Sequence, residues 1–394
     1  MNPSTIKAYN IADLRGLAAR ILPRGLFQFV DRGTEDERAL ARMRAAIDAL
    51  ALRPRVLVDV SARSTATTFF GQEARMPVVV APTGAAGLLW FDGEIEVARA
   101  ARQLGIPFTL STASIVSMER VAAEAGGRLW FQLYMWPDRA MSWELVARVK
   151  AAGYEALMVT VDTAVTPNRE YNRHNGFTLP LRISRANALD TVLHPRWMFN
   201  VLLRYMRREG IPNLENYPAA LKRSMAEKPS PVKCDSLSWD DLKELRQRWD
   251  GPLIVKGILR ADDARRVAEA GADAIVVSSH GGRNLDGAIA PLRALPGIID
   301  ALRAINPRMD VFVDGGFDRG GNIVKALALG AKGVLAGRAP LWGVAVDGAP
   351  GALLALSILR EEIDRVMAFT GSNSVQALDR DLLDIPAGFL PAAA

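Results

Sequence analysis

The chain has few residues of the types that build disulfides and metal clusters. Its 394 residues include one cysteine, Cys234, and three histidines. A single thiol excludes an internal disulfide and a thiolate metal cluster, and we predict no metal site. Neither charge dominates, since 49 lysines and arginines stand against 43 aspartates and glutamates. The basic residues are spread rather than clustered, so we do not expect a nucleic-acid partner.

Long hydrophobic runs are also missing. No stretch approaches the roughly 20 uninterrupted apolar residues that span a bilayer. Charged residues interrupt every apolar stretch of residues 1–20, so this segment lacks the continuous apolar core of a signal peptide. We therefore expect a cytoplasmic location. Hydrophobic residues make up 49% of the chain, which is enough to bury a large core.

Short apolar runs alternate with helix-length amphipathic stretches from about residue 76 onward. Because both faces of these runs are apolar, they are typical of buried parallel strands. Eight strand–helix units in succession predict a (β/α)8 TIM barrel of the α/β class, and an open doubly wound sheet is the alternative. The predicted strands are 77–84, 107–112, 129–134, 156–163, 252–257, 274–282, 310–316 and 333–338.

Three segments lie outside this alternation. Residues 1–75 are predicted as an N-terminal helical cap and lead-in, and residues 371–394 as a C-terminal tail. The barrel then covers residues 76–370. Residues 172–240 are predicted as a long insertion after the fourth strand, because an ordinary connection needs far fewer residues.

Polar residues follow nearly every predicted strand. In barrel enzymes the C-terminal ends of the strands carry the active site, so these residues are the candidates for chemistry. Strand termination or helix capping is the alternative explanation for Thr83 and Ser111. The candidates are Thr83, Ser111, Gln132, Tyr134, Thr160, Asp162, Lys256, Ser278, His280, Asp314 and Arg338.

The motif "VSSHGGRNLDG" at 277–287 ends an apolar strand at a histidine. The imidazole of His280 titrates near neutrality and can accept a proton, and Arg283 supplies a cation that can bind a carboxylate. The alternative is a structural histidine at a strand end. His174 and His194 are expected at the surface or in the insertion.

Glycines follow the seventh and eighth predicted strands, in "DGG" at 314–316 and "GR" at 337–338. Barrels commonly bind phosphate at this place through loop amides and a helix N-terminus. We predict that Gly315, Gly316, Gly337 and Arg338 bind the phosphate of a cofactor.

Seven motifs in register, "APTG", "FQLY", "VTVDT", "IVKG", "SSHGGRNLDG", "DGG" and "AGR", resemble the FMN-dependent α-hydroxy-acid dehydrogenase and oxidase family. The resemblance covers about residues 8–370. The stretches "APTGAAGLLW", "LSTAS" and "LHPRW", together with the long insertion, are most similar to the members that oxidise mandelate, an aromatic 2-hydroxy acid. The resemblance implies FMN as cofactor and oxidation of a 2-hydroxy acid to the 2-oxo acid.

The resemblance also implies a role for each site residue. His280 is the base that removes a substrate proton, and Asp162 stabilises the imidazolium. Arg283 and Arg169 bind the substrate carboxylate, and Tyr134 binds the oxygen at the carbon that is oxidised. The implied cofactor contacts are Lys256, Ser111, Gln132 and Thr160 at the flavin ring edge, Thr83 and Gly84 at its face, Ser278 nearby, Asp314 at the ribityl chain, and Gly315, Gly316, Gly337 and Arg338 at the phosphate.

Three departures from the family pattern bear on these roles. Phe29 stands where the family usually has a substrate-binding tyrosine, and a hydrogen bond lost to a charged group costs about 1.5–3 kcal/mol. Asp318 stands where the family commonly has the first of two arginines, so Arg319 or Arg338 must carry more of the phosphate charge. Ser279 and Asn284 replace an asparagine and a glutamine and look conservative.

Gly84 leaves room beside the flavin for a bulky substrate and resembles the dehydrogenases rather than the oxygen-using oxidases. A tight turn after the first strand is the alternative explanation.

The insertion suggests an electron acceptor. Residues 194–208 carry Trp197, Met198, Val201, Leu202 and Tyr205 at helical spacing beside Arg204, Arg207 and Arg208. A basic helix with such an apolar face can lie on an anionic membrane surface, so we predict peripheral contact with the inner face of the membrane and a quinone or similar acceptor. The alternative is a helix that packs on the barrel.

The family further implies a homo-tetramer. Three functions compete with oxidation of an aromatic (S)-2-hydroxy acid. They are an L-lactate-type dehydrogenase, a member repurposed for an amine or a peptide-derived substrate, and a flavin-binding electron-transfer module without turnover.

Overall fold

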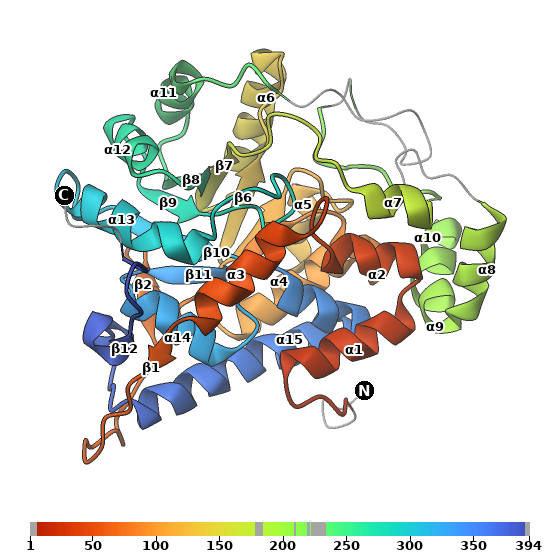
Figure 1. Cartoon of the computed structure of the whole chain (residues 1–394). Coiled ribbons are helices and arrows are strands. Elements are labelled where there is room, and N and C mark those ends of the chain that lie inside the picture. The colour runs from red at the N-terminus through yellow and green to blue at the C-terminus, as the bar shows by residue number, and fades with distance from the viewer. Residues whose placement is uncertain (1–5, 178–183, 209, 219–220, 222–233, 391–394) are drawn as a thin grey trace.

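The computed structural model describes residues 6–177, 184–208, 210–218, 221 and 234–390. Parts of the predicted segments 1–75, 172–240 and 371–394 therefore lie outside the described residues. Figure 1 shows strands at the centre of the molecule, with helices around them and the green helices of the insertion at one side.

Eight parallel strands form a closed barrel in the order β10-β11-β4-β5-β6-β7-β8-β9. The pairing of β11 with β4, in which Val334 lies opposite Val78, closes the ring and excludes the open-sheet alternative. The predicted TIM barrel is thus confirmed. The strands are β4 (Val78–Thr83), β5 (Phe108–Ser111), β6 (Leu129–Leu133), β7 (Ala156–Thr160), β8 (Leu253–Ile258), β9 (Ala274–Val277), β10 (Asp310–Asp314) and β11 (Gly333–Ala336).

Aromatic side chains fill the N-terminal end of the barrel. The hairpin of β2 (Thr67–Phe69) and β3 (Gln72–Ala74) inserts Phe69, whose ring lies 5.3 Å from that of Phe312 and 6.3 Å from that of Trp130. Arg128, just before β6, donates a hydrogen bond to the Phe69 carbonyl at 3.0 Å. This plug makes the barrel a packed core at one end, so a ligand site is confined to the other end.

Helices surround the barrel, and several of them begin with the acidic first turns seen in the sequence. Helix α4 begins with Glu94 and Glu96, and α11 begins with a capping box in which Ser238 and Asp241 satisfy each other's backbone amides. The outer helices are α4 (Gly93–Gln103), α5 (Met118–Glu124), α6 (Arg139–Ala151), α11 (Trp239–Arg248), α12 (Ala261–Glu269), α13 (Pro291–Arg303) and α14 (Gly320–Ala328).

Helix α15 (Arg338–Phe369) is long and apolar enough to cross a membrane by length and composition, but 67% of its apolar window is buried inside the fold. It bends at Asp347 and Gly348, whose backbone angles are not helical. Its two parts pack against α4, α14 and the N-terminal helix α1 (Ile11–Ile21). Burial by these neighbours accounts for its apolar composition.

The N-terminal segment continues with α2 (Arg24–Asp31), α3 (Arg38–Asp48) and β1 (Ala51–Leu52). Strand β1 pairs antiparallel with β12 (Leu383–Asp384), so the segment that leads into the barrel is joined to the C-terminal tail. Helix α3 lies beside the loops that leave β9 and β10, since its Met43 approaches Gly282 and Gly315. Three short 3-10 turns complete this part of the fold, η2 (Ala86–Leu88), η5 (Val375–Ala377) and η6 (Arg380–Leu382).

The described part of the insertion forms α7 (Glu170–Asn175), α8 (Arg185–Leu193), α9 (Pro195–Trp197), the π-helical turn η3 (Met198–Leu202) and α10 (Leu203–Arg208). The predicted membrane face does not point outward. Val201 and Tyr205 are 2% and 3% exposed, and the Trp197 indole donates to the Leu88 carbonyl at 2.7 Å. This stripe therefore packs on the barrel, because the apolar surface of η2 and Phe91 offers it a partner.

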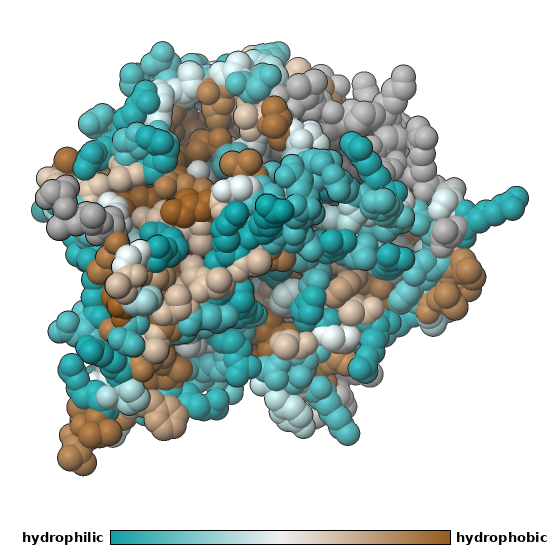
Figure 2. Space-filling model, in the orientation of Figure 1, coloured by the Kyte–Doolittle hydropathy of each residue, from teal (hydrophilic) through white to brown (hydrophobic). Residues whose placement is uncertain are grey.

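A different apolar surface of the insertion faces solvent. Figure 2 shows apolar residues gathered at this side of the molecule. Arg204 and Arg208 are turned toward the barrel, with guanidinium carbons 4.3 and 5.4 Å from the centre of the Phe91 ring. The exposed apolar surface, hereafter the outer patch, consists of Leu189, Val192, Leu193, Phe199 and Met206.

Candidate active site

A cavity of about 1040 Å³ opens at the C-terminal ends of the barrel strands. Three of the predicted site residues, Gln132, Asp162 and Ser278, do not line it themselves but hydrogen-bond to residues that do. The structure therefore brings the whole predicted set together around one space. The predicted residues that line the cavity are Thr83, Gly84, Ser111, Tyr134, Thr160, Arg169, Lys256, His280, Arg283, Asp314, Gly315, Gly316, Gly337 and Arg338.

His280 and Asp162 form a hydrogen-bonded pair at the cavity. The Nδ1 atom of His280 lies 2.9 Å from an Asp162 carboxylate oxygen. Burial lowers the pKa of His280 below its ordinary value of 6.5, although Asp162 opposes the shift, so the neutral imidazole is favoured. Burial acts to raise the pKa of Asp162, but His280 outweighs it and holds that pKa below the ordinary value. The pair therefore presents a neutral base beside a carboxylate.

The backbone around this pair is tightly constrained. His280 has a φ of 56°, in the left-handed region that non-glycine residues rarely occupy. Gly257 has a φ of 111°, and a Cβ there would lie 2.7 Å from the Asp162 Cβ. Glycine in β8 thus permits the close approach of Asp162 to the strand end. Strain of this kind is common at active sites.

Two arginines lie side by side next to the pair. Burial and the neighbouring Arg283 together lower the pKa of Arg169 to about 10. Burial likewise lowers the pKa of Arg283, which donates to the Arg32 carbonyl at 2.9 Å and lies 5.1 Å from the centre of the Phe29 ring. Two buried like charges favour an anion between them. Tyr134 lines the same end, and burial raises the pKa of its hydroxyl, which keeps it a proton donor.

A buried polar chain joins three strands across the cavity floor. Lys256 donates to Ser278 at 2.8 Å, Ser278 donates to Asp314 at 2.8 Å, and the Lys256 ammonium lies 3.0 Å from the Asp314 carboxylate. Burial acts to lower the pKa of Lys256, but Asp314 and Asp162 outweigh it and raise that pKa. Lys256 is therefore a fixed positive charge at the bottom of the cavity.

Some buried polar atoms around the cavity lack a hydrogen-bond partner among the described residues. Ser111 donates to the Gln132 side-chain oxygen at 3.0 Å, which turns the Gln132 amide nitrogen away. Among the described residues, this nitrogen and one Asp314 carboxylate oxygen have no hydrogen-bond partner. Buried polar groups are rarely left unpaired, so these atoms fit a ligand with polar edges.

Glycines shape the other end of the cavity. Gly315 and Gly316 have φ values of 107° and 87°, and a Cβ on Gly315 would lie 2.5 Å from the Met43 sulfur. Arg338 begins α15, where it donates to the Val30 and Gly281 carbonyls at 3.1 and 2.9 Å, and burial lowers its pKa to about 10. The turn and the helix N-terminus together suit a phosphate.

Asp318, the charged departure from the family pattern, and its neighbour Arg319 both have partners here. Asp318 forms an ion pair with Arg44 of α3. Arg319 lies 3.2 Å from Glu362 of α15. Arg319, one of the two arginines predicted to carry more phosphate charge, is thus engaged with a carboxylate and does not line the cavity.

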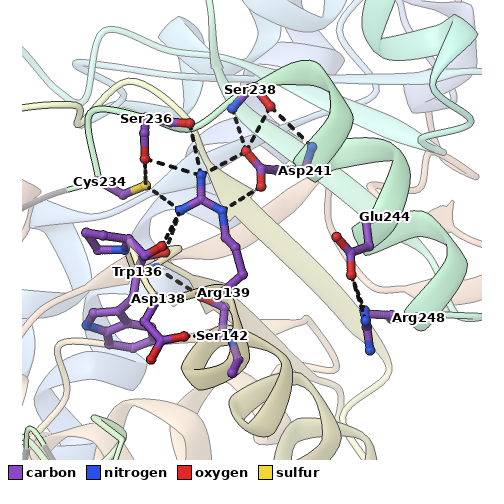
Figure 3. A network of polar contacts seen from close by, with 12 residues as sticks. Trp136, Asp138, Arg139, Ser142, Cys234, Ser236, Ser238, Asp241, Glu244 and Arg248 are labelled. Carbon is purple, nitrogen blue, oxygen red and sulfur yellow. Dashed lines mark hydrogen bonds and ion pairs between the residues drawn. The ribbon is translucent and has the colours of Figure 1, made fainter.

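A polar network ties the end of the insertion to the loop between β6 and α6 (Figure 3). Arg139, at the start of α6, donates to the Trp136 carbonyl at 2.6 Å and pairs bidentately with Asp241 at 2.5 and 2.9 Å. It also reaches the Cys234 sulfur at 3.0 Å. Because Trp136 and Cys234 both line the cavity, this network fixes one of its walls.

Sequence reasoning missed residues that reach the cavity from outside the strand ends. Phe177, on the insertion, packs against Phe29 with ring centres 5.3 Å apart. Arg44 lines the cavity from α3. Periodicity placed both outside the barrel, and no local motif marks either as a site residue.

A closed barrel with a buried histidine–aspartate pair, two buried arginines and a glycine turn beside a helix N-terminus at one mouth has the arrangement of a (β/α)8-barrel enzyme. A family model described as FMN-dependent dehydrogenase matches residues 18–385. The chain belongs to this family of FMN-dependent dehydrogenases, and the predicted family resemblance is confirmed.

Individual relatives agree with this assignment. The chain is 39% identical to (S)-mandelate dehydrogenase of Pseudomonas putida over 95% of this chain and 93% of that protein. It is 41% identical to an L-lactate dehydrogenase of Caulobacter sp. (strain K31) over 94% and 97%. A crystal structure of the monotopic membrane protein (S)-mandelate dehydrogenase superimposes with a TM-score of 0.90 at 38% identity, covering 97% of this chain and 100% of that one.

The residues present fit FMN, the cofactor of the family. The unpaired Gln132 nitrogen suits the polar edge of the flavin, and the unpaired Asp314 oxygen suits a hydroxyl of the ribityl chain. The turn at Gly315 and Gly316 and the N-terminus of α15 suit the phosphate. Ring edge and phosphate thus have complementary groups at opposite ends of one cavity.

Proposed function

We propose that the protein oxidises an aromatic (S)-2-hydroxy acid to the 2-oxo acid. The observation that carries this proposal is the neutral His280, paired with Asp162, next to two buried arginines. Removal of hydrogen from a carbon that bears a carboxylate and a hydroxyl requires a base, a counter-charge for the acid and an electron sink. Bound FMN supplies the electron sink, which no side chain of the chain can provide.

His280 removes a proton from the substrate in this proposal. Its Nδ1 faces Asp162, so its Nε2 is the atom that accepts the proton. The imidazolium that forms is stabilised by the Asp162 carboxylate. Gly257 lets Asp162 lie close to the end of β8, and the Asn284 side chain donates a hydrogen bond to the Asp162 carbonyl at 2.7 Å. Asp162 is therefore fixed in place, and it orients the imidazole before the substrate arrives.

Arg283 and Arg169 bind the substrate carboxylate, and Tyr134 donates a hydrogen bond to the oxygen at the carbon that is oxidised. A carboxylate between the arginines relieves their mutual repulsion, so part of the binding free energy comes from removing an unfavourable contact. The raised pKa of Tyr134 suits a neutral hydroxyl donor.

The cofactor contacts follow the positions of the remaining residues. Lys256 would stabilise negative charge on the flavin ring edge, the unpaired Gln132 amide nitrogen would donate there, and Asp314 would accept from the ribityl chain. Thr83 and Gly84 would hold the ring face. The further assigned contacts are Ser111, Thr160 and Ser278 at the ring and Gly315, Gly316, Gly337 and Arg338 at the phosphate.

An aromatic substrate is favoured by the walls of the cavity. Phe29 and Phe177 pack on each other beside Arg283, so an aryl group bound at the arginines meets aromatic surface. Gly84 does not have a left-handed backbone, and a Cβ there would only touch Ala113 at 3.4 Å. The turn does not demand glycine at this position, which supports a role for Gly84 in leaving space.

A panel of 2-hydroxy acids tests this proposal. On anaerobic mixing, (S)-mandelate, (S)-phenyllactate and (S)-4-hydroxymandelate are expected to reduce the flavin, which is measured as the loss of its visible absorbance. The (R) enantiomers, lactate and glycolate should react far more slowly. Bleaching by L-lactate at a rate equal to that of (S)-mandelate would instead favour the lactate-type alternative, which the similarity to L-lactate dehydrogenases supports.

Two other outcomes distinguish the remaining alternatives. A yellow protein that only an amine or a peptide-derived compound bleaches would identify a repurposed member, in which Phe29 has changed the substrate class. A yellow protein that no donor bleaches would fit a flavin-binding electron-transfer module.

The acceptor in this proposal is a quinone or similar carrier at the inner face of a membrane, with the protein otherwise cytoplasmic. The outer patch supports it, since Leu193 and Phe199 are 67% and 59% exposed on adjoining helices. Large apolar side chains gathered on one surface mark interaction sites. One related crystal structure is that of a monotopic membrane protein. Assembly as a homo-tetramer stays a prediction from the family resemblance.

Charge substitutions in the outer patch test membrane contact. Wild-type protein is expected to sediment with vesicles that contain anionic phospholipid, and Leu193→Glu combined with Phe199→Glu should leave it in the supernatant. Ile305→Glu serves as the control. Ile305 is an exposed apolar residue just after α13, outside the insertion, and this variant should still sediment. Equal sedimentation of all three proteins would contradict contact through this patch.

A further inference from the structure

We propose that Arg44, on the N-terminal helix α3, binds the phosphate of FMN, and that Asp318 holds the Arg44 side chain at the cavity. This inference rests on the FMN dependence of the family and is independent of which substrate is oxidised. It adds a residue from outside the barrel strands to the cofactor site.

Helix α3 lies directly against the glycine turn of the phosphate end. The Met43 sulfur occupies the space where a Cβ of Gly315 would lie, at 2.5 Å, and the Ile47 side chain stands 3.2 Å from the corresponding position on Gly316. Arg44 lies between these two residues on the same helix and lines the cavity together with Asp318. The contacts of Met43 and Ile47 therefore fix the backbone position of Arg44 beside the glycine turn.

The other cations near this end already have partners, and Arg338, which is assigned to the phosphate above, has committed part of its guanidinium. Arg338 directs its guanidinium at the Val30 and Gly281 carbonyls, and Arg15 pairs bidentately with Asp31 at 2.5 and 2.7 Å. Arg319 pairs with Glu362 and does not line the cavity. A phosphate dianion that enters here needs a further cation. Arg15 and Arg44 both line the cavity and pair with carboxylates, and Arg44 is the one whose helix packs on the glycine turn.

Asp318 makes such a cation necessary. Its carboxylate lines the same end of the cavity as the phosphate, and two anions at close range repel each other unless a cation lies between them. Asn322 donates to one Asp318 oxygen at 3.2 Å, which leaves the other oxygen for Arg44. The planar guanidinium has five N–H donors, so Arg44 can keep Asp318 and bind a phosphate oxygen at the same time.

The pair is exposed enough to be shared. The side chains of Arg44 and Asp318 are 48% and 30% exposed. An exposed ion pair contributes little stability by itself, so a phosphate can compete for the guanidinium at small cost. A buried and saturated pair could not take this role.

Cofactor affinity tests the inference without any turnover. Apoprotein is titrated with FMN and with riboflavin, which differ only in the phosphate, and binding is followed by quenching of flavin fluorescence. Arg44→Met is expected to weaken FMN binding by about tenfold to a hundredfold, the loss typical of a charge-assisted hydrogen bond, and to leave riboflavin binding unchanged. The loss should shrink as ionic strength rises, because screening weakens the wild-type contact.

Companion variants separate this role from a structural one. Arg38→Met, on the same helix and paired with Asp36, should bind FMN as the wild type does. Arg44→Lys, which keeps the charge, should lose less FMN affinity than Arg44→Met. Adding Asp318→Asn to Arg44→Met should restore part of the FMN affinity, because the uncompensated carboxylate is gone.

Two results would overturn the inference. One is an equal loss of FMN and riboflavin affinity in Arg44→Met, which would assign the residue a structural role. The other is unchanged FMN affinity in that variant. If Arg44→Met does not fold, the comparison of FMN with riboflavin in Arg44→Lys decides in the same way.

Discussion

Replacing His280 by glutamine should abolish reduction of FMN by 2-hydroxy acids while the protein keeps its yellow colour. Glutamine can retain a hydrogen bond with Asp162, but it cannot accept a proton in the accessible pH range. Loss of a positioned base typically costs about 10²–10⁴-fold in rate, and we expect a loss in this range. Single-turnover reduction, followed by flavin absorbance, measures the loss directly.

The matched control is His174→Gln, which changes an exposed histidine of α7. It should reduce at the wild-type rate. If His280→Gln were reduced within a few-fold of the wild-type rate, His280 would not be the base, and a flavin-binding module or a different base would have to be considered.

The proposed role of His280 as the base also predicts how the rate of flavin reduction depends on pH. Catalysis needs neutral His280, and burial lowers its pKa below 6.5, so the reduction rate should be flat near neutral pH and fall only at more acidic pH. Asp162 raises the pKa of His280, so in Asp162→Asn the acid limb should move to still lower pH. The rate on the plateau should fall as well, because the imidazolium loses its carboxylate partner. An acid limb above pH 6.5 in the wild type would contradict the neutral, buried imidazole.

Replacing Arg283 by methionine should lower kcat/KM for 2-hydroxy acids by roughly 30-fold to several-thousandfold, as truncation of one partner of a desolvated charge pair costs about 2–5 kcal/mol. The substrate carboxylate would then face only Arg169. Methionine keeps much of the apolar volume against Phe29, so the protein should still bind FMN. Steady-state kinetics and the affinity for a 2-oxo acid, read from the flavin spectrum, measure the two parts of this prediction.

Lysine at position 283 should recover little of this loss. A lysine ammonium is a point charge that cannot pair with both carboxylate oxygens in one plane. The control is Arg42→Met, which removes a hydrogen bond of 2.8 Å to the Asp286 carbonyl in the same loop without touching the cavity lining. A wild-type affinity for the 2-oxo acid in Arg283→Met would rule out its role as a carboxylate ligand.

The barrel and most of its site were predictable because each depends on a local pattern. Buried parallel strands are apolar on both faces, so the eight runs are visible as such, and the polar residue after each run must lie at the same mouth once the barrel closes. His280 and Arg283 could be selected because they follow directly on a strand. Asp162 and Arg169 follow β7, which β8 separates from β9 in the barrel, and the loops after β7 and β9 meet at the same mouth.

The apolar stripe of the insertion shows where such patterns fail. Helical spacing of Trp197, Val201 and Tyr205 predicts an apolar face, but it does not say what covers that face. In the structure η2 and Phe91 cover it, while Leu193 and Phe199 form part of the surface that stays exposed. Only the presence or absence of a neighbouring surface distinguishes a packing face from a docking face.

The sequence by itself determined the eight strand–helix units and the set of polar groups at the strand ends, because period, length and strand-end position are properties of neighbouring residues. Closure of the barrel was decided by the pairing of β11 with β4. Only the tertiary structure decided the protonation of His280, the pairing of Arg44 with Asp318 and the aromatic wall of Phe29 and Phe177. These depend on burial and on contacts between segments far apart in the chain, and no local pattern records the distance between such segments.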